Sequence, residues 1–466
     1  MFDEYINTVI AGGENENCIY FYIRFRFGNE FDRKRGKINR RLLMSTRQCS
    51  LGGTKVKRKC IVMFLIVSLF FSVGNIQEKA NAKTQQEMTN REDRSIQLSK
   101  VVAGVEYPEA VTDEQDWKVN KKDKYEFPIN CEKRQWSQYK THNEMLEACT
   151  VPDEILENAT TEQLLDMVLD YPLLCDIYAF DTVEQGVAVV ASQFNGFAEL
   201  IKREDLSDVV LERYIDADIQ NGTKNLKENF NKVSAVVVME DLLAQKDMIS
   251  DLTLKEKEEL ANAIEEKTVE KKDRNIFYGN VTTFYDIAAK NGVKEELGLK
   301  DTKDLVHDEE QASSNKGTVK TPKGTKVTVY KYTYKGKSWA DSVTNRYVKA
   351  YPHAKKLGDA DNRYNCHSYA WYSASTSNRY WMNSPKPYVE DGSYKCIGNS
   401  PTAVGQKVVY KDQSYVPMDN WIHSGITVNT SSIIKSKWGQ GPLMQHGILY
   451  SPYNGQFTTI DYYKKK

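Results

Sequence analysis

Residues 421–428 read Trp-Ile-His-Ser-Gly-Ile-Thr-Val, and residues 432–439 read Ser-Ile-Ile-Lys-Ser-Lys-Trp-Gly. The first segment predicts an apolar strand that opens on His423, and the second predicts another strand. A hairpin would set these two strands side by side. A histidine at the start of a rigid strand is held in place, as a general base beside a nucleophile must be. His423 is therefore the candidate general base.

Upstream of this hairpin, residues 365–372 read Asn-Cys-His-Ser-Tyr-Ala-Trp-Tyr. The small and aromatic residues after Cys366 predict a helix that begins at this cysteine. The positive end of the helix dipole lowers the pKa of a thiol there and favours the thiolate. The same N–H groups can hold an oxyanion. Cys366 is therefore the candidate nucleophile, whereas His367 would point elsewhere on the helix.

A general base also needs a third group that orients its ring. The strand after His423 offers Lys435, Ser436 and Lys437 for this role. A lysine side chain has no acceptor for an imidazole N–H, but the Ser436 hydroxyl does. His446 follows the same strand in the sequence. His446 and Ser436 are therefore alternative orienting residues.

The order of a cysteine, a histidine and a polar residue on the next strand resembles the NlpC/P60 superfamily of papain-like cysteine hydrolases and the related CHAP amidases. The resemblance covers roughly residues 336–466. It implies a Cys-bearing helix packed on an antiparallel sheet, with Cys366 as nucleophile and His423 as base. The third position departs from the family, which usually places His, Asn, Asp or Glu there. The implied activity is that of a thiol protease or amidase, which needs no cofactor and no metal and cleaves amide bonds in peptidoglycan peptides.

Each of these residues also has a structural interpretation. Cys366 could be an inert core thiol or form a disulfide with Cys396, and His423 could be a core histidine. Zinc binding by Cys366, His367, His423 and Cys396 lacks the usual spacing of ligand pairs. At the level of the protein, the alternatives are a secreted binding or adhesion module without turnover, and an acyltransferase or transglutaminase on the same fold.

The N-terminal part of the sequence predicts export. A basic segment precedes an apolar run at residues 60–73, and Ala80-Asn81-Ala82 follows as a cleavage site. The run is too short for a membrane span and has the length of a signal-peptide core. We expect residues 1–82 to be absent from the mature chain, with residues 1–43 lying upstream of the native start. The mature protein should be secreted or cell-wall associated, without stable membrane insertion.

The mature chain would keep an odd number of cysteines, so at least one thiol should be unpaired in an oxidising compartment. These cysteines are Cys131, Cys149, Cys175, Cys366 and Cys396.

The remaining sequence predicts an α+β protein with several parts. These are a flexible leader at residues 83–125, an acidic helical domain at 126–300, a linker at 301–325 and the cysteine hydrolase domain at 326–466.

Local patterns support the helical domain and the entry into the last domain. Thr160 with Gln163, and Thr253 with Glu256, have the spacing of capping boxes. Residues 325–334 alternate with period two and predict a strand. Isolated histidines such as His142 are expected at the surface.

The charge of the chain is divided between its parts. Residues 83–315 carry 28 Lys and Arg against 49 Asp and Glu, while residues 316–466 carry 22 against 8. A large acidic region beside a basic one is atypical of nucleic-acid binders. The division favours a basic module whose partner is an anionic cell-wall polymer or peptide, or the acidic half of the same chain.

Overall fold

The computed structural model describes residues 96–219, 225–273, 283–301, 315–412, 420–455 and 458–466, and the backbone of three strands before residue 50. The chain divides into two compact units, Met1–Gln85 and Gln86–Lys466. The predicted signal sequence lies outside the described residues.

The first unit contains one antiparallel sheet in the order β1-β2-β3. Its strands are β1 (Tyr5–Val9), β2 (Tyr22–Asp32) and β3 (Lys37–Thr46). The prediction that residues 1–43 precede the native start stays a prediction.

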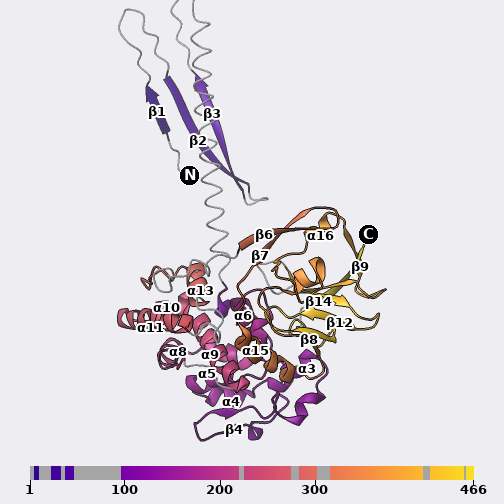
Figure 1. Ribbon diagram of the computed structural model, residues 1–466. Coiled ribbons are helices and arrows are strands. Elements are labelled where there is room, and N and C mark those ends of the chain that lie inside the picture. The colour runs from indigo at the N-terminus through magenta and orange to yellow at the C-terminus, as the bar shows by residue number, and fades with distance from the viewer. Residues whose placement is uncertain are drawn as a thin grey trace, which may run out of the picture. The chain divides into compact units, whose positions relative to one another are not determined.

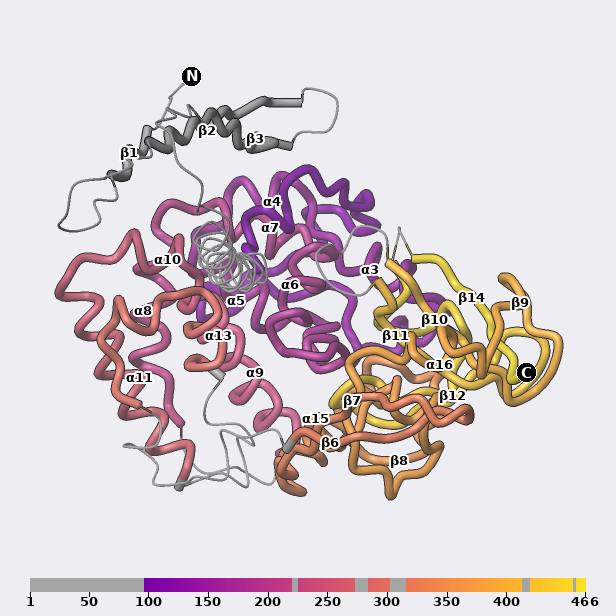
Figure 2. The backbone as a smooth tube through the Cα atoms, turned by 90° about the horizontal axis from the view of Figure 1, so that it is seen from above, coloured from indigo at the N-terminus to yellow at the C-terminus, as the bar shows by residue number. Residues whose placement is uncertain are grey.

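The second unit begins with helices and ends with a sheet (Figure 1). Helices α8, α10, α11 and α13 gather at one end of it, and strands β9 and β14 lie at the other (Figure 2). The α-helices are α2 (Leu98–Val102), α3 (His142–Cys149), α4 (Asp153–Asn158), α5 (Thr161–Leu169), α6 (Val183–Gln193), α7 (Asn195–Ile201), α8 (Leu206–Ile215), α9 (Leu226–Leu243), α10 (Lys246–Asp251), α11 (Leu254–Asp273), α13 (Thr283–Asn291), α15 (Lys337–Ala350) and α16 (Pro387–Glu390). Short 3₁₀ turns are η1 (Glu114–Asp116), η2 (Arg134–Gln138) and η3 (Leu174–Tyr178).

The main sheet is antiparallel throughout, in the order β8-β13-β12-β11-β10-β14-β9. Its strands are β8 (Lys355–Gly358), β9 (Tyr394–Gly398), β10 (Lys407–Asp412), β11 (Trp421–Thr427), β12 (Ile433–Lys437), β13 (Leu443–Gly447) and β14 (Thr458–Lys465). Two small sheets pair β4 (Lys118–Val119) with β5 (Tyr125–Glu126), and β6 (Asn315–Lys320) with β7 (Lys326–Lys331). The described chain is therefore a mixture of helix and sheet, as predicted. None of its helices has the length and apolar character needed to cross a membrane.

Several local predictions are confirmed. The alternating segment after residue 325 forms β7, and the two apolar segments after residue 420 form the antiparallel pair β11–β12. The Thr160 and Thr253 hydroxyls each accept a hydrogen bond from the backbone N–H three residues later, as a capping box requires. The structure adds two capping boxes that begin at Thr141 and Thr182.

Two boundary predictions are corrected. Residues 83–125 were expected to be a flexible leader, but in its described part, residues 96–125, Leu98, Val102 and Trp117 are buried in the main core. Apolar side chains at these positions outweigh the polar composition of the segment, because their burial is favourable. The second half of the expected linker forms β6, which pairs with β7 along its whole length.

The helical region and the sheet share one hydrophobic core. The Trp136 indole donates to the carbonyl of Ala350 at 2.7 Å, and Arg346 donates to the carbonyls of Tyr171 and Pro172. Helix α15 carries Arg346 and Ala350 and lies beside α9 and η3. These contacts fix the helical region against the part of the chain that carries Cys366.

Candidate active site

A short helical segment begins at Cys366 and continues as the π-helical turn η4 (Ser368–Tyr372) against β11 and β12. Asn365 holds its start, because its Oδ1 accepts from the N–H of Ser368 at 3.1 Å and from the N–H of Met382 at 3.1 Å. The Asn365 Nδ2 donates to the carbonyl of Met382 at 2.8 Å and to Asp181 Oδ1 at 3.0 Å. The helix predicted at Cys366 is therefore present, but it is short.

The environment of Cys366 corrects the predicted effect on its thiol. The residue is only 3% exposed. Burial raises its pKa, and the nearby charge of Asp181 raises it further. Hydrogen bonds from the N–H groups of Ser424 and His367, and the charge of Lys437, act in the opposite direction without overcoming burial. At neutral pH the group is a thiol, because the dipole of so short a helix is small beside the desolvation of an anion.

Cys366 nevertheless lies next to the strand of the candidate base. The N–H of Ser424 that reaches the thiol belongs to the residue directly after His423. Strand β12 pairs with β11 only at Ile426 and Thr427. The N-terminal part of β11, which carries His423, is therefore free of β12 and open toward the Cys366 segment. The structure thus brings Cys366 against the backbone of the strand that carries His423.

His423 is fully buried, and its ring is held by aromatic contacts. The imidazole stacks on Tyr453 with ring centroids 3.5 Å apart, and the ring of Tyr410 lies at 5.2 Å. Neither ring nitrogen has a hydrogen-bond partner among the described residues. Burial lowers the pKa of His423 well below its usual value, and the charges of His446 and His367 add to this effect. The ring is therefore neutral at pH 7.

The two candidate orienting residues are hydrogen-bonded to each other, and neither is hydrogen-bonded to His423. Ser436 Oγ and His446 Nε2 are 2.7 Å apart, and the Trp438 indole donates to Ser436 Oγ at 3.1 Å. Burial lowers the pKa of His446 to about 4. The assignment of either residue as an orienting group stays a prediction. In this structure, Tyr453 orients the His423 ring by stacking.

His367 connects the helical segment to β11 by two hydrogen bonds. Its Nδ1 lies 2.8 Å from Ser424 Oγ, and its Nε2 lies 3.1 Å from the carbonyl of Trp421. Because the carbonyl can only accept, Nε2 carries the proton and Nδ1 accepts from the Ser424 hydroxyl. The Trp371 indole donates to the same hydroxyl at 3.0 Å. Successive side chains of a strand point to opposite faces, so Ser424 and His423 face opposite sides of the sheet.

Lys437 lies on β12, the strand expected to carry an orienting residue, but it has another role. Its buried Nζ donates to the carbonyls of Asp361, Gly439 and Gly441 at 2.8, 2.6 and 2.6 Å. Burial lowers its pKa to about 7, and the charges of Asp361 and Cys366 oppose that shift. Sequence reasoning excluded lysine as an acceptor and so missed its role as a cation that favours the Cys366 thiolate.

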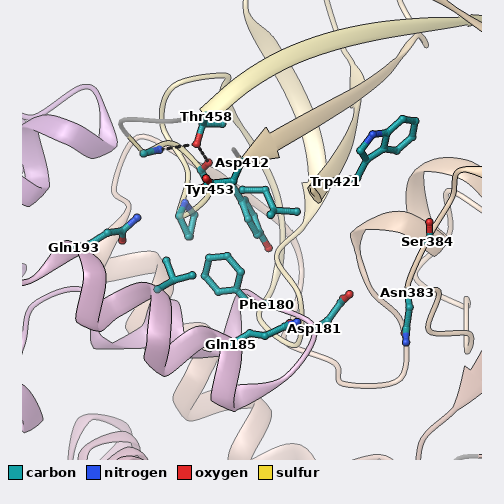
Figure 3. A pocket seen from close by; sticks show the side chains of 14 residues that line it. Phe180, Asp181, Gln185, Gln193, Asn383, Ser384, Asp412, Trp421, Tyr453 and Thr458 are labelled. Atoms are coloured by element: carbon teal, nitrogen blue, oxygen red, sulfur yellow. Dashed lines mark hydrogen bonds between the residues drawn. The ribbon is translucent and has the colours of Figure 1, made fainter. Parts of the chain in front are cut away.

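A pocket of about 130 Å³ opens beside this region (Figure 3). Trp421 lines it from β11 and Tyr453 from the turn before β14, while Phe180 and Asp181 line it from the segment that enters α6. It therefore reaches the Tyr453 ring that stacks on His423 and the Asp181 carboxylate that accepts from Asn365. The sequence gives no local signal for Asp181 or Tyr453, because each meets the site through contacts made in the folded chain.

His142 corrects the expectation of a surface histidine. It is fully buried between the helical region and the sheet. Its Nδ1 lies 2.9 Å from the carbonyl of Asn454, and its Nε2 lies 3.2 Å from Asp176 Oδ2. The Tyr351 hydroxyl donates to the same carboxylate oxygen at 2.7 Å. This network joins the two regions and has no access to the pocket by Tyr453.

The five cysteines of the second unit are all free thiols, so the alternative of a Cys366–Cys396 disulfide is not realised. Within the described ranges, no three His, Cys, Asp or Glu side chains are grouped to hold a metal ion. No protein-family model, curated protein or solved structure matches the chain.

Proposed function

We propose that the second unit is a cysteine hydrolase in which Cys366 is the nucleophile and His423 the general base. The observation that carries the proposal is the state of His423. A buried polar group without a hydrogen bond costs about 1–3 kcal/mol, so its presence needs an explanation, and a catalytic role is one. His423 lies on β11, and the N–H of the next residue, Ser424, reaches the Cys366 thiol.

The lowered pKa of His423 suits the first step, because a general base must be unprotonated. His423 has no hydrogen-bond partner in the described part of this structure, so the proposed reaction requires its ring to turn toward Cys366. The imidazole then accepts the proton of Cys366 as the sulfur attacks an amide carbonyl, so a C–S bond forms and the carbonyl oxygen becomes an oxyanion. The C–N bond then breaks, and the imidazolium gives its proton to the leaving amine. Water attacks the thioester, His423 accepts a proton from it, and the freed thiol recovers that proton as the carboxylic acid is released.

Other groups at the site support this chemistry. The N–H groups of Ser424 and His367 and the cation of Lys437 favour negative charge at Cys366, and such fixed donors stabilise a charged transition state in a dry site. We propose a papain-like fold of the NlpC/P60 type for residues 326–466, on the basis of the resemblance described above and the antiparallel sheet on which the Cys366 segment packs.

The proposed substrate is an amide bond in a peptidoglycan peptide, acted on outside the cell or at the cell wall. Two features support it: the predicted signal sequence, and the excess of Lys and Arg over Asp and Glu in residues 316–466. A net positive surface raises the local concentration of an anionic wall polymer and speeds its encounter. Neither a cofactor nor nucleic acid is needed for this reaction.

The decisive experiment compares Cys366→Ala with Cys149→Ala on purified peptidoglycan fragments. Both cysteines are buried, so the two substitutions remove the same atoms from similar surroundings. We expect Cys366→Ala to lower the cleavage rate by on the order of 10⁴ or more and Cys149→Ala to retain it. Mass spectra should show a new amine and a new carboxyl terminus. Full activity of Cys366→Ala would overturn the proposal.

The same assay separates hydrolysis from the alternatives. With hydroxylamine present, an acyltransferase or transglutaminase would place the acyl group on the added amine in preference to water. A binding or adhesion module would retain the fragments without changing their masses, and alkylation of Cys366 would leave that binding unchanged.

A further inference from the structure

Residues Tyr178–Asp181, here called the strap, connect η3 to α6 and cross from the helical region to the candidate site. The carbonyl of Tyr178 accepts from the N–H of Gln440 at 2.8 Å, and the carbonyl of Ala179 accepts from the Tyr453 hydroxyl at 2.5 Å. The Phe180 ring packs edge-on against Tyr453 with centroids 5.4 Å apart. All four strap residues thus contact the part of the chain that carries Cys366, since Asp181 accepts from Asn365.

The partners of the strap are the immediate neighbours of the candidate catalytic residues. Tyr453 stacks on His423, and Asn365 precedes Cys366 in the chain. Asp181 is also the charge that most disfavours the Cys366 thiolate. The strap therefore contacts a neighbour of each member of the proposed Cys–His pair.

The loop after β12 is shaped to receive the strap. Gly439 has φ +51°, and a Cβ at this position would lie 2.3 Å from the carbonyl oxygen of Ala179 and 2.6 Å from that of Tyr178. Both the backbone conformation and the close approach require glycine. The strap is thus seated against a surface that fits it closely and is not a loosely lying connection.

The strap also borders two pockets. The pocket by Tyr453 and a second one of about 190 Å³, lined by Tyr332 and Trp381, are both lined by Asp181. Asn365 Nδ2 joins Asp181 to the carbonyl of Met382, and the neighbours of Met382 face different pockets: Trp381 the second and Asn383 the first. Asp181 is thus common to both pockets, and its hydrogen-bond partner Asn365 directly precedes Cys366 in the chain.

We infer that the strap is an autoinhibitory segment whose displacement joins the two pockets into one groove across Cys366 and admits an extended chain. This inference rests on the proposed function for its biological meaning, but the occlusion of the thiol can be measured without a substrate. A chain that replaced the strap would find the same donors: the N–H of Gln440, the Tyr453 hydroxyl and the Asn365 amide.

The test measures the iodoacetamide labelling rate of Cys366 in the full chain, with Cys396 as an exposed internal reference. The strap variant is Phe180→Ala, which removes the ring packed on Tyr453 and keeps the Asp181 charge. The control is Phe284→Ala, which removes a buried ring of α13 that lines neither pocket. Asp181→Asn measures the effect of the charge on the thiol by itself.

We expect Cys366 to be labelled at least about ten times faster in Phe180→Ala, with the Cys396 rate unchanged, because the strap is loosened while the Asp181 charge is kept. Phe284→Ala should leave both rates unchanged. An unchanged Cys366 rate in folded strap variants would overturn the inference, as would an equal increase in Phe284→Ala.

Peptidoglycan cleavage by the same variants distinguishes the two proposals. If the strap variants are labelled faster but no variant cleaves peptidoglycan, the strap covers Cys366 as inferred and the proposed hydrolase function is wrong. If the parent chain cleaves peptidoglycan but the labelling rate is the same in the strap variants, the hydrolase function is supported and the autoinhibitory role of the strap is wrong.

Discussion

Two histidines, His142 and His423, are fully buried in the same unit, yet their surroundings differ. His142 lies where the helical region meets the sheet, and both of its ring nitrogens have partners, Asn454 and Asp176. His423 lies within the sheet and is held by stacking on Tyr453, while both of its nitrogens lack a partner among the described residues. The arrangement of His142 favours folding, because both nitrogens of its buried ring have a hydrogen-bond partner. The second arrangement is unfavourable for folding, which is consistent with a ring kept for a chemical role.

The largest expected effect is on activity, from His423→Phe. The phenyl ring can keep the stacking on Tyr453 while removing both unsatisfied nitrogens. We expect the cleavage rate to fall by on the order of 10²–10⁴, the usual contribution of a general base. The unfolding free energy should stay equal or rise, because an apolar group of similar shape replaces an unpaired polar one. Cleavage assays and urea unfolding measure the two effects. A large loss of stability would instead make His423 a structural residue.

The opposite result is expected for His142→Leu. This substitution leaves the Asp176 carboxylate buried with fewer partners and removes the link to Asn454. We expect the unfolding free energy to fall by about 3 kcal/mol, as for other broken buried pairs. Cleavage per folded molecule should change little, because the network does not reach the pocket. Unfolding curves that match those of the parent chain would contradict this interpretation.

The difference between the two histidines also shows how much of the molecule can be predicted from sequence. Strand β7, the β11–β12 hairpin and the capping boxes were predicted because their signals lie within a few neighbouring residues. The partners of His142 are 34 and 312 residues away, so no local pattern marks this residue as buried.

At the candidate site, the same limit applies to the pKa of Cys366. The sequence predicted a helix at this cysteine and, from its dipole, a lowered pKa. The direction was wrong because burial and Asp181 dominate, and Asp181 lies 184 residues from the asparagine that binds it. The residue types of a site can be identified from motifs, but their electrostatic state depends on which distant segments cover them.

A smaller effect is expected from pH, through His446. Its pKa is lowered from 6.5 to about 4 by burial, so the unfolded chain binds its proton at a higher pH than the native state does. This stabilising contribution is complete above pH 6.5 and is lost as the pH falls toward 4. At pH 5 the loss from His446 alone should be about 2 kcal/mol. Urea unfolding at pH 7.5 and pH 5 should show a smaller decrease for His446→Gln than for the parent chain. Equal decreases would mean that His446 is not buried in neutral form.

The smallest expected effect comes from a buried group in the helical region that also lacks partners. Both carboxylate oxygens of Asp241 in α9 are unsatisfied among the described residues, and the side chain is fully buried. Burial raises its pKa well above 3.8, and the charge of Glu184 adds to this effect. A raised pKa in the native state stabilises the fold below the unfolded pKa, and this contribution is lost as the pH rises.

Asp241→Asn therefore tests whether an unsatisfied group is itself the sign of a catalytic role. We expect a gain of about 1 kcal/mol in unfolding free energy at pH 7, which shrinks to zero near pH 3.5, where both states of the parent chain are protonated. Peptidoglycan cleavage should stay at the parent rate, in contrast to His423→Phe, because Asp241 lines neither pocket beside Cys366. If cleavage fell in both variants, lack of a partner would not distinguish His423 from other buried groups, and its assignment as the base would rest only on its position next to Ser424, whose N–H reaches Cys366.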